Sequence, residues 1–485
     1  MDIANRNSQF HMKFAAGLFA FTLLSASATE FPVMKANTAL SFEQAIRAAQ
    51  INDPWLTGNV HQQRAIESMS IAVHTLPDPK VTIGLANLPT NGFDFGQEAM
   101  TQAKVGVSQM FPRGDTLDIK SQQLKTQSEA FPYQRKDRES KVAVMVGNLW
   151  LDVYQVQQSI ALIQSNRSLF EQLADVAEAS YSSALGKTRQ QDIVRAQLEL
   201  TRLEDRLDQL EQQKNRHAGM LVQWLSTFST ENSAEYDAPL GSDFALHNIV
   251  VNRELPQIEL INSDLVYKEN WHRPEELLPY FSSHPSVVAI EKKIKASNAG
   301  INLAKQKYQP EWGVNASYGY RGDDPMGRSR ADLFSVGVTF DLPLFTENRQ
   351  DKEVQSAVYE TEAVKTEKLL LLRQLLGTYS SAKGRLLRLI DRQNLYKTKL
   401  LPQIYDQAEA SLTAYTNDDG DFSEVVRSRI AVLNAEIDQL TLNVEEQKIR
   451  LELNYLFIDS RDTSTTKNHM NLSTSRQYAA ILGEK

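Results

Sequence analysis

The sequence predicts a mainly α-helical protein with a membrane β-barrel, in which one unit of helix, strand, strand, long helix and helix occurs twice. The first observation is that landmarks recur at one constant offset. Pro54 recurs as Pro285, and the tripeptide VGV at 105–107 recurs at 336–338. The other observations are two pairs of short alternating strands and, after each pair, a very long heptad pattern. Internal repetition of this kind indicates the order of the elements before any local pattern is considered.

A helix with a break opens the first unit. We expect it to run from Ser41 to about Thr75, because Ser41 suits the N-cap and Gln44 stands three residues later as the partner in a capping box. Proline restricts the conformation of the residue before it. The pair Asp53 and Pro54 therefore predicts a kink or an interruption within this helix.

Two pairs of strands are predicted, the first within residues 80–111 and the second within 311–342. In each strand, apolar residues alternate with small or polar ones, so that one face is apolar. Each strand is about ten residues long, which spans a bilayer when the strand is tilted. A soluble β-sandwich gives a similar alternation. The residues expected to face lipid are Val105, Val107, Trp312, Val336 and Val338.

Each strand pair is followed by a long helical hairpin, predicted at about 113–226 and 345–457. From Val142 onward, apolar residues follow a spacing of four and three through Ala184, and Arg167 interrupts the series. Such spacing is typical of a coiled coil. A helix of about 45 residues is roughly 68 Å long. The hairpins are therefore predicted to span a distance greater than most globular domains need.

The turns of the two hairpins contain residues that end helices. The first turn is Leu185, Gly186 and Lys187, in which the glycine suits a helix C-terminus. The second turn is acidic and includes Gly420. Two interpretations of its carboxylates are open. They form either an ordinary solvated turn or, in an oligomer, a ring around a pore entrance that favours cations. These carboxylates are Asp418, Asp419 and Asp421.

The N-terminal residues 1–28 are predicted to be a secretory signal peptide. They carry positive charge, then an apolar stretch, then a small-residue cleavage site that ends near Ala28. Either Met1 or Met12 can serve as the start. The remaining chain divides into a first repeat at 29–230, an irregular insert at 231–282, a second repeat at 283–458 and a flexible tail. The tail covers residues 459–485.

Composition excludes several classes of protein. The chain has no cysteine, which excludes disulfides, thiolate metal sites and cysteine nucleophiles. The formal net charge of -8 argues against nucleic-acid binding. Residues 186–188 (GKT) imitate the end of a phosphate-binding loop, but Tyr181 stands where that loop requires glycine. We therefore expect no catalytic residues, no cofactor and no bound metal, and we interpret His61, Met69 and His74 as structural.

Four strands cannot close into a membrane barrel. An open edge in lipid leaves backbone groups without hydrogen bonds, and small barrels have about eight strands or more. Several copies of the chain must therefore contribute. Three copies give twelve strands, with the helical hairpins projecting from one end as a tunnel.

The chain resembles the outer membrane efflux proteins, the TolC-like outer membrane factors of Gram-negative bacteria. The resemblance covers about residues 41–457 and rests on the duplicated order of elements. It also rests on local motifs after each long helix. These motifs are Tyr181, Gly186, Asp192 and Gln197 in the first repeat and Ala414, Tyr415, Gly420, Asp421 and Phe422 in the second.

The resemblance implies a homotrimer with a twelve-stranded barrel in outer-membrane lipid and an α-helical coiled-coil tunnel in the periplasm. It also implies a passive exit duct that docks onto a periplasmic adaptor protein and an inner-membrane pump of the RND type. The residues expected at the gated entrance and the adaptor contact are Leu185, Gly186, Lys187, Asp192, Asp418, Asp419, Gly420 and Asp421.

The cargo is suggested by one further similarity. Residues 76–79 (LPDP) and 84–89 (GLANLP) look like the branch of the family that serves heavy-metal cation pumps. Drugs or other small molecules are the alternative cargo. The alternative class of protein is a periplasmic coiled-coil adaptor or scaffold without a channel, although the bare turn at Leu185 leaves no room for the β-domain of an adaptor. A secreted enzyme with a helical body is the third interpretation.

Overall fold

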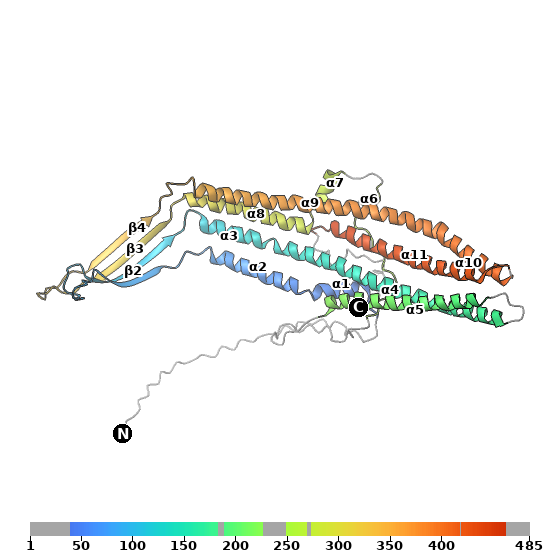
Figure 1. The fold of residues 1–485 in the computed structure, drawn as a ribbon. Coiled ribbons are helices and arrows are strands. Elements are labelled where there is room, and N and C mark those ends of the chain that lie inside the picture. The colour runs from blue at the N-terminus through green and yellow to red at the C-terminus, as the bar shows by residue number, and fades with distance from the viewer. Residues whose placement is uncertain (1–38, 183–188, 227–248, 269–272, 418, 462–485) are drawn as a thin grey trace, which may run out of the picture. The chain divides into compact units, whose positions relative to one another are not determined.

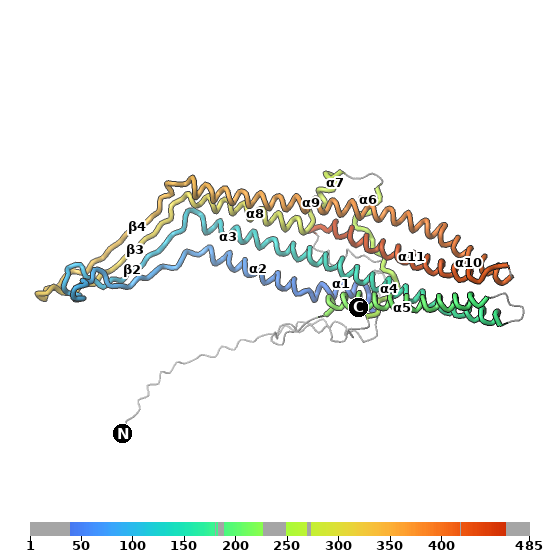
Figure 2. Tube along the Cα trace, viewed as in Figure 1, coloured from blue at the N-terminus to red at the C-terminus, as the bar shows by residue number. Residues whose placement is uncertain are grey.

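The computed structural model describes residues 39–182, 189–226, 249–268, 273–417 and 419–461, all within one compact unit, Ala39–Lys485. The predicted signal peptide, most of the predicted tail, the first hairpin turn and Asp418 lie outside the described residues. Within this unit, long helices run side by side, and a sheet lies beyond one end of them (Figure 1). The Cα trace runs to the sheet and back along the helices once in each half of the chain (Figure 2).

The first helical segment is divided as predicted. Helix α1 (Phe42–Ile51) begins with a complete capping box, in which Ser41 Oγ accepts from the Gln44 amide at 3.2 Å and Gln44 Oε1 accepts from the Ser41 amide at 3.0 Å. Its apolar residues recur at helical spacing and are buried. Helix α2 (Pro54–Ala72) starts at the proline, and the Asp53 carboxylate caps it.

Four antiparallel strands form one sheet in the order β1–β2–β3–β4. The strands are β1 (Lys80–Ala86), β2 (Gln102–Phe111), β3 (Trp312–Tyr320) and β4 (Leu333–Phe340). Strands β1 and β4 are its edges. Strand β2 pairs with β3 although they are far apart in sequence, with Ala103 opposite Tyr320 and Phe111 opposite Trp312. The sheet therefore joins the two halves of the chain.

The first hairpin consists of α4 (Phe131–Ser182), which has 52 residues, and α5 (Gln190–Leu225), which has 36. At 1.5 Å per residue α4 is about 78 Å long. Within the range predicted for this hairpin, about 113–226, a separate helix α3 (Thr116–Ser128) precedes α4. The physical reason is Pro132, which has no amide hydrogen to give to a preceding turn and disfavours helical geometry at the residue before it.

The second half has a similar order of elements, with its helix interruptions at other places. Helix α8 (Pro285–Lys305) and the short η1 (Gln306–Tyr308) lead to the sheet, and α9 (Gln350–Leu395) leaves it. A π-helical segment, η2 (Tyr396–Leu400), then precedes α10 (Leu401–Thr416), and α11 (Phe422–Leu456) returns. Pro402 removes one amide donor, and a π segment accommodates this gap within a long helix.

The described part of the predicted insert is irregular apart from two short helices, α6 (Ser263–Tyr267) and α7 (Pro274–Ser282). Side chains of α11 hold the backbone of this insert in place. Gln447 Oε1 accepts from the Ile258 amide at 2.8 Å, and Asn454 Oδ1 accepts from the Ile261 amide at 2.9 Å. These bonds satisfy backbone groups that no regular structure pairs.

Apolar cores hold the helices together. One lies among α6, α7, α9 and α11, where the aromatic rings of Phe281, Tyr379 and Phe457 meet. Another lies between the two hairpins and includes Phe170 of α4, Leu203 of α5 and Leu433 of α11. The hairpins are therefore packed against each other through the seam that the heptad pattern predicts.

A buried ion pair links the break between α1 and α2 to helix α4. Arg138 Nε lies 2.7 Å from Asp53 Oδ2, and the Asp53 side chain is 3% exposed. The guanidinium carbon lies 5.7 Å from the ring centre of Trp55 and 5.4 Å from that of Trp224. Nearby, the Asn52 amide group donates to the Leu225 carbonyl at 3.0 Å. This cluster joins α2, α4 and α5.

In the part of the chain that the structure describes, no helix combines the length and the apolar character needed to cross a membrane.

Candidate functional site

The first candidate site is the apolar face of the sheet. Residues directly opposite each other in antiparallel strands place their side chains on the same face, and the register puts Ile83, Val105 and Tyr318 on one such row. The exposed members of this face are Val81, Ile83, Leu85, Val105, Val107, Phe111, Trp312, Val314, Tyr318, Tyr320, Phe334, Val336, Val338 and Phe340.

This apolar face is continuous over all four strands and is open to solvent in the single chain. Val336, in the middle of the edge strand β4, is 64% exposed. Soluble monomers rarely expose a contiguous apolar patch of this extent, and such patches mark contacts with membranes or with other proteins. The five residues predicted to face lipid all belong to it.

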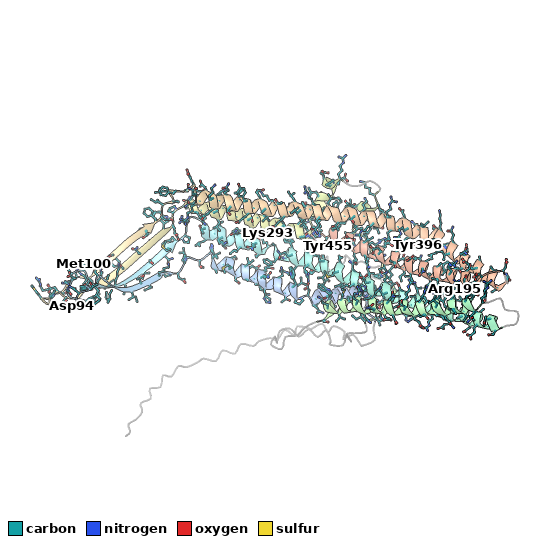
Figure 3. The ribbon with its side chains drawn as sticks, viewed as in Figure 1. Asp94, Met100, Arg195, Lys293, Tyr396 and Tyr455 are labelled. Carbon is teal, nitrogen blue, oxygen red and sulfur yellow. The ribbon has the colours of Figure 1, made fainter. Side chains whose placement is uncertain are left out.

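Aromatic residues gather at both ends of the apolar face. At the end nearer the helices, the rings of Trp312 and Phe340 lie 5.0 Å apart. At the opposite end, Tyr320 stacks against Phe95 of the β1–β2 loop at 6.2 Å. Asp94 and Met100, labelled in Figure 3, lie in the same loop. Two aromatic girdles on one apolar band are typical of strands that cross a bilayer.

The opposite face of the sheet is small and polar. Its central rows contain Gly106, Ser317 and Ser335 across β2, β3 and β4. The separation into one apolar and one polar face follows the period-two alternation over most of the sheet. The exceptions are Gln109 on the apolar face and Met110 and Leu333 on the polar face.

The second candidate site is the turn of the second hairpin. The Asn417 amide donates to the Thr413 carbonyl and the Asp419 amide to the Ala414 carbonyl, each at 3.0 Å. Gly420 then passes so close to the end of α10 that a Cβ there would lie 2.5 Å from the Tyr415 nitrogen. The glycine is therefore required by close backbone approach.

Two of the carboxylates predicted at the hairpin turns cap helices. Asp421 Oδ1 accepts from the Ser423 amide at 2.9 Å at the start of α11. That bond, assisted by the positive charges of Arg195 and Arg189, holds the pKa of Asp421 below its usual range. Arg195 lies toward the turn end of α5 (Figure 3).

Asp192 performs the corresponding task at the start of α5. Its Oδ2 accepts from the Arg189 amide at 3.0 Å, and the residue is buried. Both aspartates therefore stabilise helix N-termini, a role that short polar side chains perform well. Leu185, Gly186, Lys187 and Asp418 lie outside the described residues, so their place at an entrance stays a prediction.

Replacing Gly420 with alanine should open the second turn. The added methyl group collides with backbone atoms of residues 414 and 415, so the turn must shift at a cost of about 1–3 kcal/mol. We expect limited proteolysis between residues 414 and 424 to be faster by about tenfold or more. Gly219→Ala is the matched control, because a Cβ there meets nothing within 4 Å and alanine favours a helix. Equal cleavage of the two variants would contradict the packing described for Gly420.

A buried histidine, His284, joins α8 to the end of α11. Its Nδ1 accepts from the Ser286 amide at 3.3 Å and lies 2.7 Å from Ser286 Oγ, while Nε2 lies 3.0 Å from the Tyr455 carbonyl oxygen. The Tyr455 hydroxyl donates to Asp137 Oδ1 of α4 at 2.8 Å (Tyr455 is labelled in Figure 3). Burial lowers the pKa of His284 and, with the Asp137 charge, raises the pKa of Tyr455.

The His284 contacts predict a loss of thermal stability in mild acid. The unfolded chain takes up a proton near the ordinary histidine pKa of about 6.5, whereas the folded chain resists it. Stability is therefore present above that pH and falls as the pH drops toward the lowered pKa, by about 1.4 kcal/mol for each unit of difference. We expect Tm to fall between pH 7.5 and pH 5.5.

His284→Asn provides the control, since asparagine keeps an acceptor for the cap of α8 but does not titrate in this range. Its Tm should change less than that of the parent protein between the two pH values. An identical change in both proteins would show that other groups cause the loss.

No side-chain cluster suited to a metal ion appears among the described residues, judged by groups of three or more histidine, cysteine, aspartate or glutamate side chains. His74 instead lies beside Asp118 of α3, with 3.2 Å between Nδ1 and Oδ1 and both side chains exposed.

No protein-family model and no curated protein sequence matches this chain. Solved structures do match it. The outer-membrane channel OprN aligns with a TM-score of 0.66 and 15% identity, covering 86% of this chain and 89% of that one. CusC, which forms a transmembrane channel, aligns with a TM-score of 0.65 and 14% identity, covering 86% of this chain and 91% of that one. The CmeC outer membrane channel of Campylobacter jejuni aligns with a TM-score of 0.66 and 11% identity, covering 89% of each chain.

Likeness at these identities shows a shared fold. The fold of this chain is shared with these outer-membrane channels. The mainly helical chain with a small antiparallel sheet that the sequence resemblance implies is confirmed, and the closed barrel and the trimer stay predictions.

Proposed function

We propose that this protein is the outer-membrane exit duct of a tripartite efflux system in a Gram-negative bacterium. The observation that carries the proposal is the continuous apolar face of the sheet, bordered by aromatic residues at both ends and backed by a small, polar face. This is the division that a membrane strand needs, with lipid on one side and water on the other.

The proposal requires several copies of the chain. The sheet has two edges, β1 and β4, whose outer backbone groups need partners before they can enter lipid. Pairing the β4 edge of one copy with the β1 edge of the next closes the sheet. Three copies give a barrel of twelve strands, and their hairpins continue it as a helical tunnel on the periplasmic side.

The hairpin turns then lie at the far end of the tunnel, where a periplasmic adaptor and an inner-membrane RND-type pump would meet them. The apolar core that joins α4, α5 and α11 supports this arrangement (Figure 1). Asp192 and Asp421 stabilise the starts of α5 and α11, the helices that follow the two turns.

Two measurements test the proposal, the drug and metal sensitivity of a deletion strain and the conductance of the purified protein. Deleting the gene should make the bacterium hypersensitive to exported compounds, and the purified protein should conduct ions in stepwise fashion in a planar lipid bilayer. A protein recovered as a soluble periplasmic monomer would instead support the adaptor or scaffold alternative, against which the exposed apolar face of the sheet argues.

The heavy-metal cargo stays a prediction. It rests on the similarity of residues 76–89 to the metal branch and on the acidic second turn. Sensitivity of the deletion strain to heavy-metal cations, with no change toward organic drugs, would support it. The reverse pattern would assign the duct to drugs or other small molecules. The carboxylate-ring hypothesis makes a separate prediction. A triple variant with Asp418→Asn, Asp419→Asn and Asp421→Asn should lose its preference for cations in bilayer conductance measurements.

A further inference from the structure

The polar face of the sheet contains two charged residues, and both are lysines. Lys80 lies in β1 opposite Ser108, and Lys104 lies in β2 opposite Gly84. No acidic residue occurs within the four strands, all of which the structure describes. Glycine, serine, threonine and asparagine make up most of the remaining positions on this face.

Lys104 is surrounded by glycines. Its partners across the two neighbouring strands are Gly84 and Gly319, and Gly106 follows on the same face of β2. Glycine has no side chain that could cover or pair the ammonium group. The space above Gly84 is open, whereas the Gln102 side chain lies over Gly319. Both lysines are exposed in the single chain.

Acidic residues next to β4 lie beyond its ends. Asp341, just after β4, continues the alternation of the polar face, forms an ion pair with Arg113 and accepts from the Glu311 amide at 2.7 Å. Asp332, just before β4, continues the alternation of the apolar face and accepts from the Arg321 amide at 3.0 Å. The positive charge of the strands is therefore not balanced within the length of the sheet.

We propose that Lys80 and Lys104 give the sheet-lined part of the duct a preference for anionic solutes. The proposal rests on the proposed function, because the polar face surrounds water only if copies of the chain close a barrel. Each copy then adds two ammonium groups to the lumen. Rings of like charge in a pore attract ions of opposite sign and repel ions of the same sign.

This assignment concerns the chemistry of the cargo. Anionic small molecules would be concentrated on their way out through the barrel, whereas a free metal cation would meet repulsion there. The lysines therefore favour the anionic members of the alternative cargo class over hydrated heavy-metal cations.

The absence of cysteine allows a direct test, since one introduced thiol is then the sole target for thiol reagents. Ser108→Cys places a reporter on the polar face, opposite Lys80. Val107→Cys, its neighbour on the apolar face, is the matched control. The full-length protein is reconstituted in lipid vesicles, and we compare its reaction rates with a sulfonate-bearing and a trimethylammonium-bearing methanethiosulfonate.

The reaction rate of each reagent at Ser108→Cys is first divided by the rate of the same reagent with a free thiol in solution. The corrected rate of the sulfonate reagent should then exceed that of the trimethylammonium reagent, and the ratio of the two corrected rates is the readout. Two unit charges about 7 Å apart in water predict a ratio of about fivefold to tenfold. Lys80→Gln together with Lys104→Gln should reduce the ratio to near one. The double arginine variant should retain it.

A second measurement keeps both lysines and changes the salt concentration, so that it does not depend on whether the lysine variants assemble. Raising the ionic strength to about 1 M shortens the screening length to about 3 Å, so the ratio should fall toward one. A ratio that ignores both salt and the Gln variants, while Val107→Cys stays unreactive, would overturn the lysine inference and leave the exit duct intact. Equal reactivity of Val107→Cys and Ser108→Cys would contradict the barrel itself, and with it both proposals.

Discussion

Replacing Val336 with arginine should prevent the protein from assembling in the outer membrane. Val336 lies in the middle of β4, opposite Ala316, on the apolar face of the sheet. Arginine on the lipid side of a barrel near the bilayer midplane costs about 2–4 kcal/mol. A trimer would bear this cost in every copy, so we expect little or no assembled protein.

The matched control is Ser335→Arg, one residue earlier in the same strand. Ser335 lies opposite Ser317 on the polar face, where a charged side chain would reach water. The measurement is the heat-modifiable band in outer-membrane fractions. We expect the band to persist for Ser335→Arg and to disappear for Val336→Arg. Loss of the band in both variants, or in neither, would be inconsistent with the assignment of the two faces.

Replacing Arg138 with methionine should strongly destabilise the helical region. The guanidinium group pairs with a carboxylate that is almost fully buried, and it lies between two tryptophan rings. Removing one partner of a buried ion pair leaves an uncompensated charge and costs about 3–5 kcal/mol. Methionine is chosen because it preserves much of the packing between Trp55 and Trp224.

The second variant in this test combines Arg138→Met with Asp53→Asn. In the parent protein, the Asp53 carboxylate accepts a hydrogen bond from the Trp55 amide at 3.1 Å. Asparagine is neutral, and its side-chain oxygen can accept the same bond and cap α2. The double variant should therefore be more stable than Arg138→Met alone, as judged by Tm or by the midpoint of denaturant unfolding. A loss below about 1 kcal/mol in Arg138→Met would mean that the pair behaves like an exposed one.

The strands and long helices could be predicted from sequence because their patterns are strictly periodic. Alternation in β2 and β4 placed Val105 and Val336 on one face, and the register of the sheet bears this out. The capping box at Ser41 and the break at Pro54 were local signals with one structural meaning each. Such features depend on neighbouring residues alone, which a single sequence displays.

The interruptions of the long helices were not predicted, although a local signal for each was present. Pro132 separates α3 from α4, and Pro402 follows the π segment η2. Pro132 precedes the heptad series, which begins at Val142, so that series gives no sign of the break between α3 and α4. At Pro402 the backbone adjusts locally to the missing donor.

The contacts that organise the candidate sites could not be predicted, because they join residues distant in sequence. The environment of Arg138 depends on Asp53 and Trp224, and that of His284 depends on Tyr455. For the acidic turn the sequence left a solvated turn and a ring of carboxylates both open, and it did not indicate that Asp421 caps a helix. The position of Lys104 between Gly84 and Gly319 follows only from the strand register.

The most direct test of the central claim is the mass of the detergent-extracted protein from outer-membrane fractions, measured before and after heating. A closed barrel predicts a species of about three chains that dissociates on heating, because β1 and β4 need partners from other copies. A monomer released from the periplasm without detergent would contradict the exit duct.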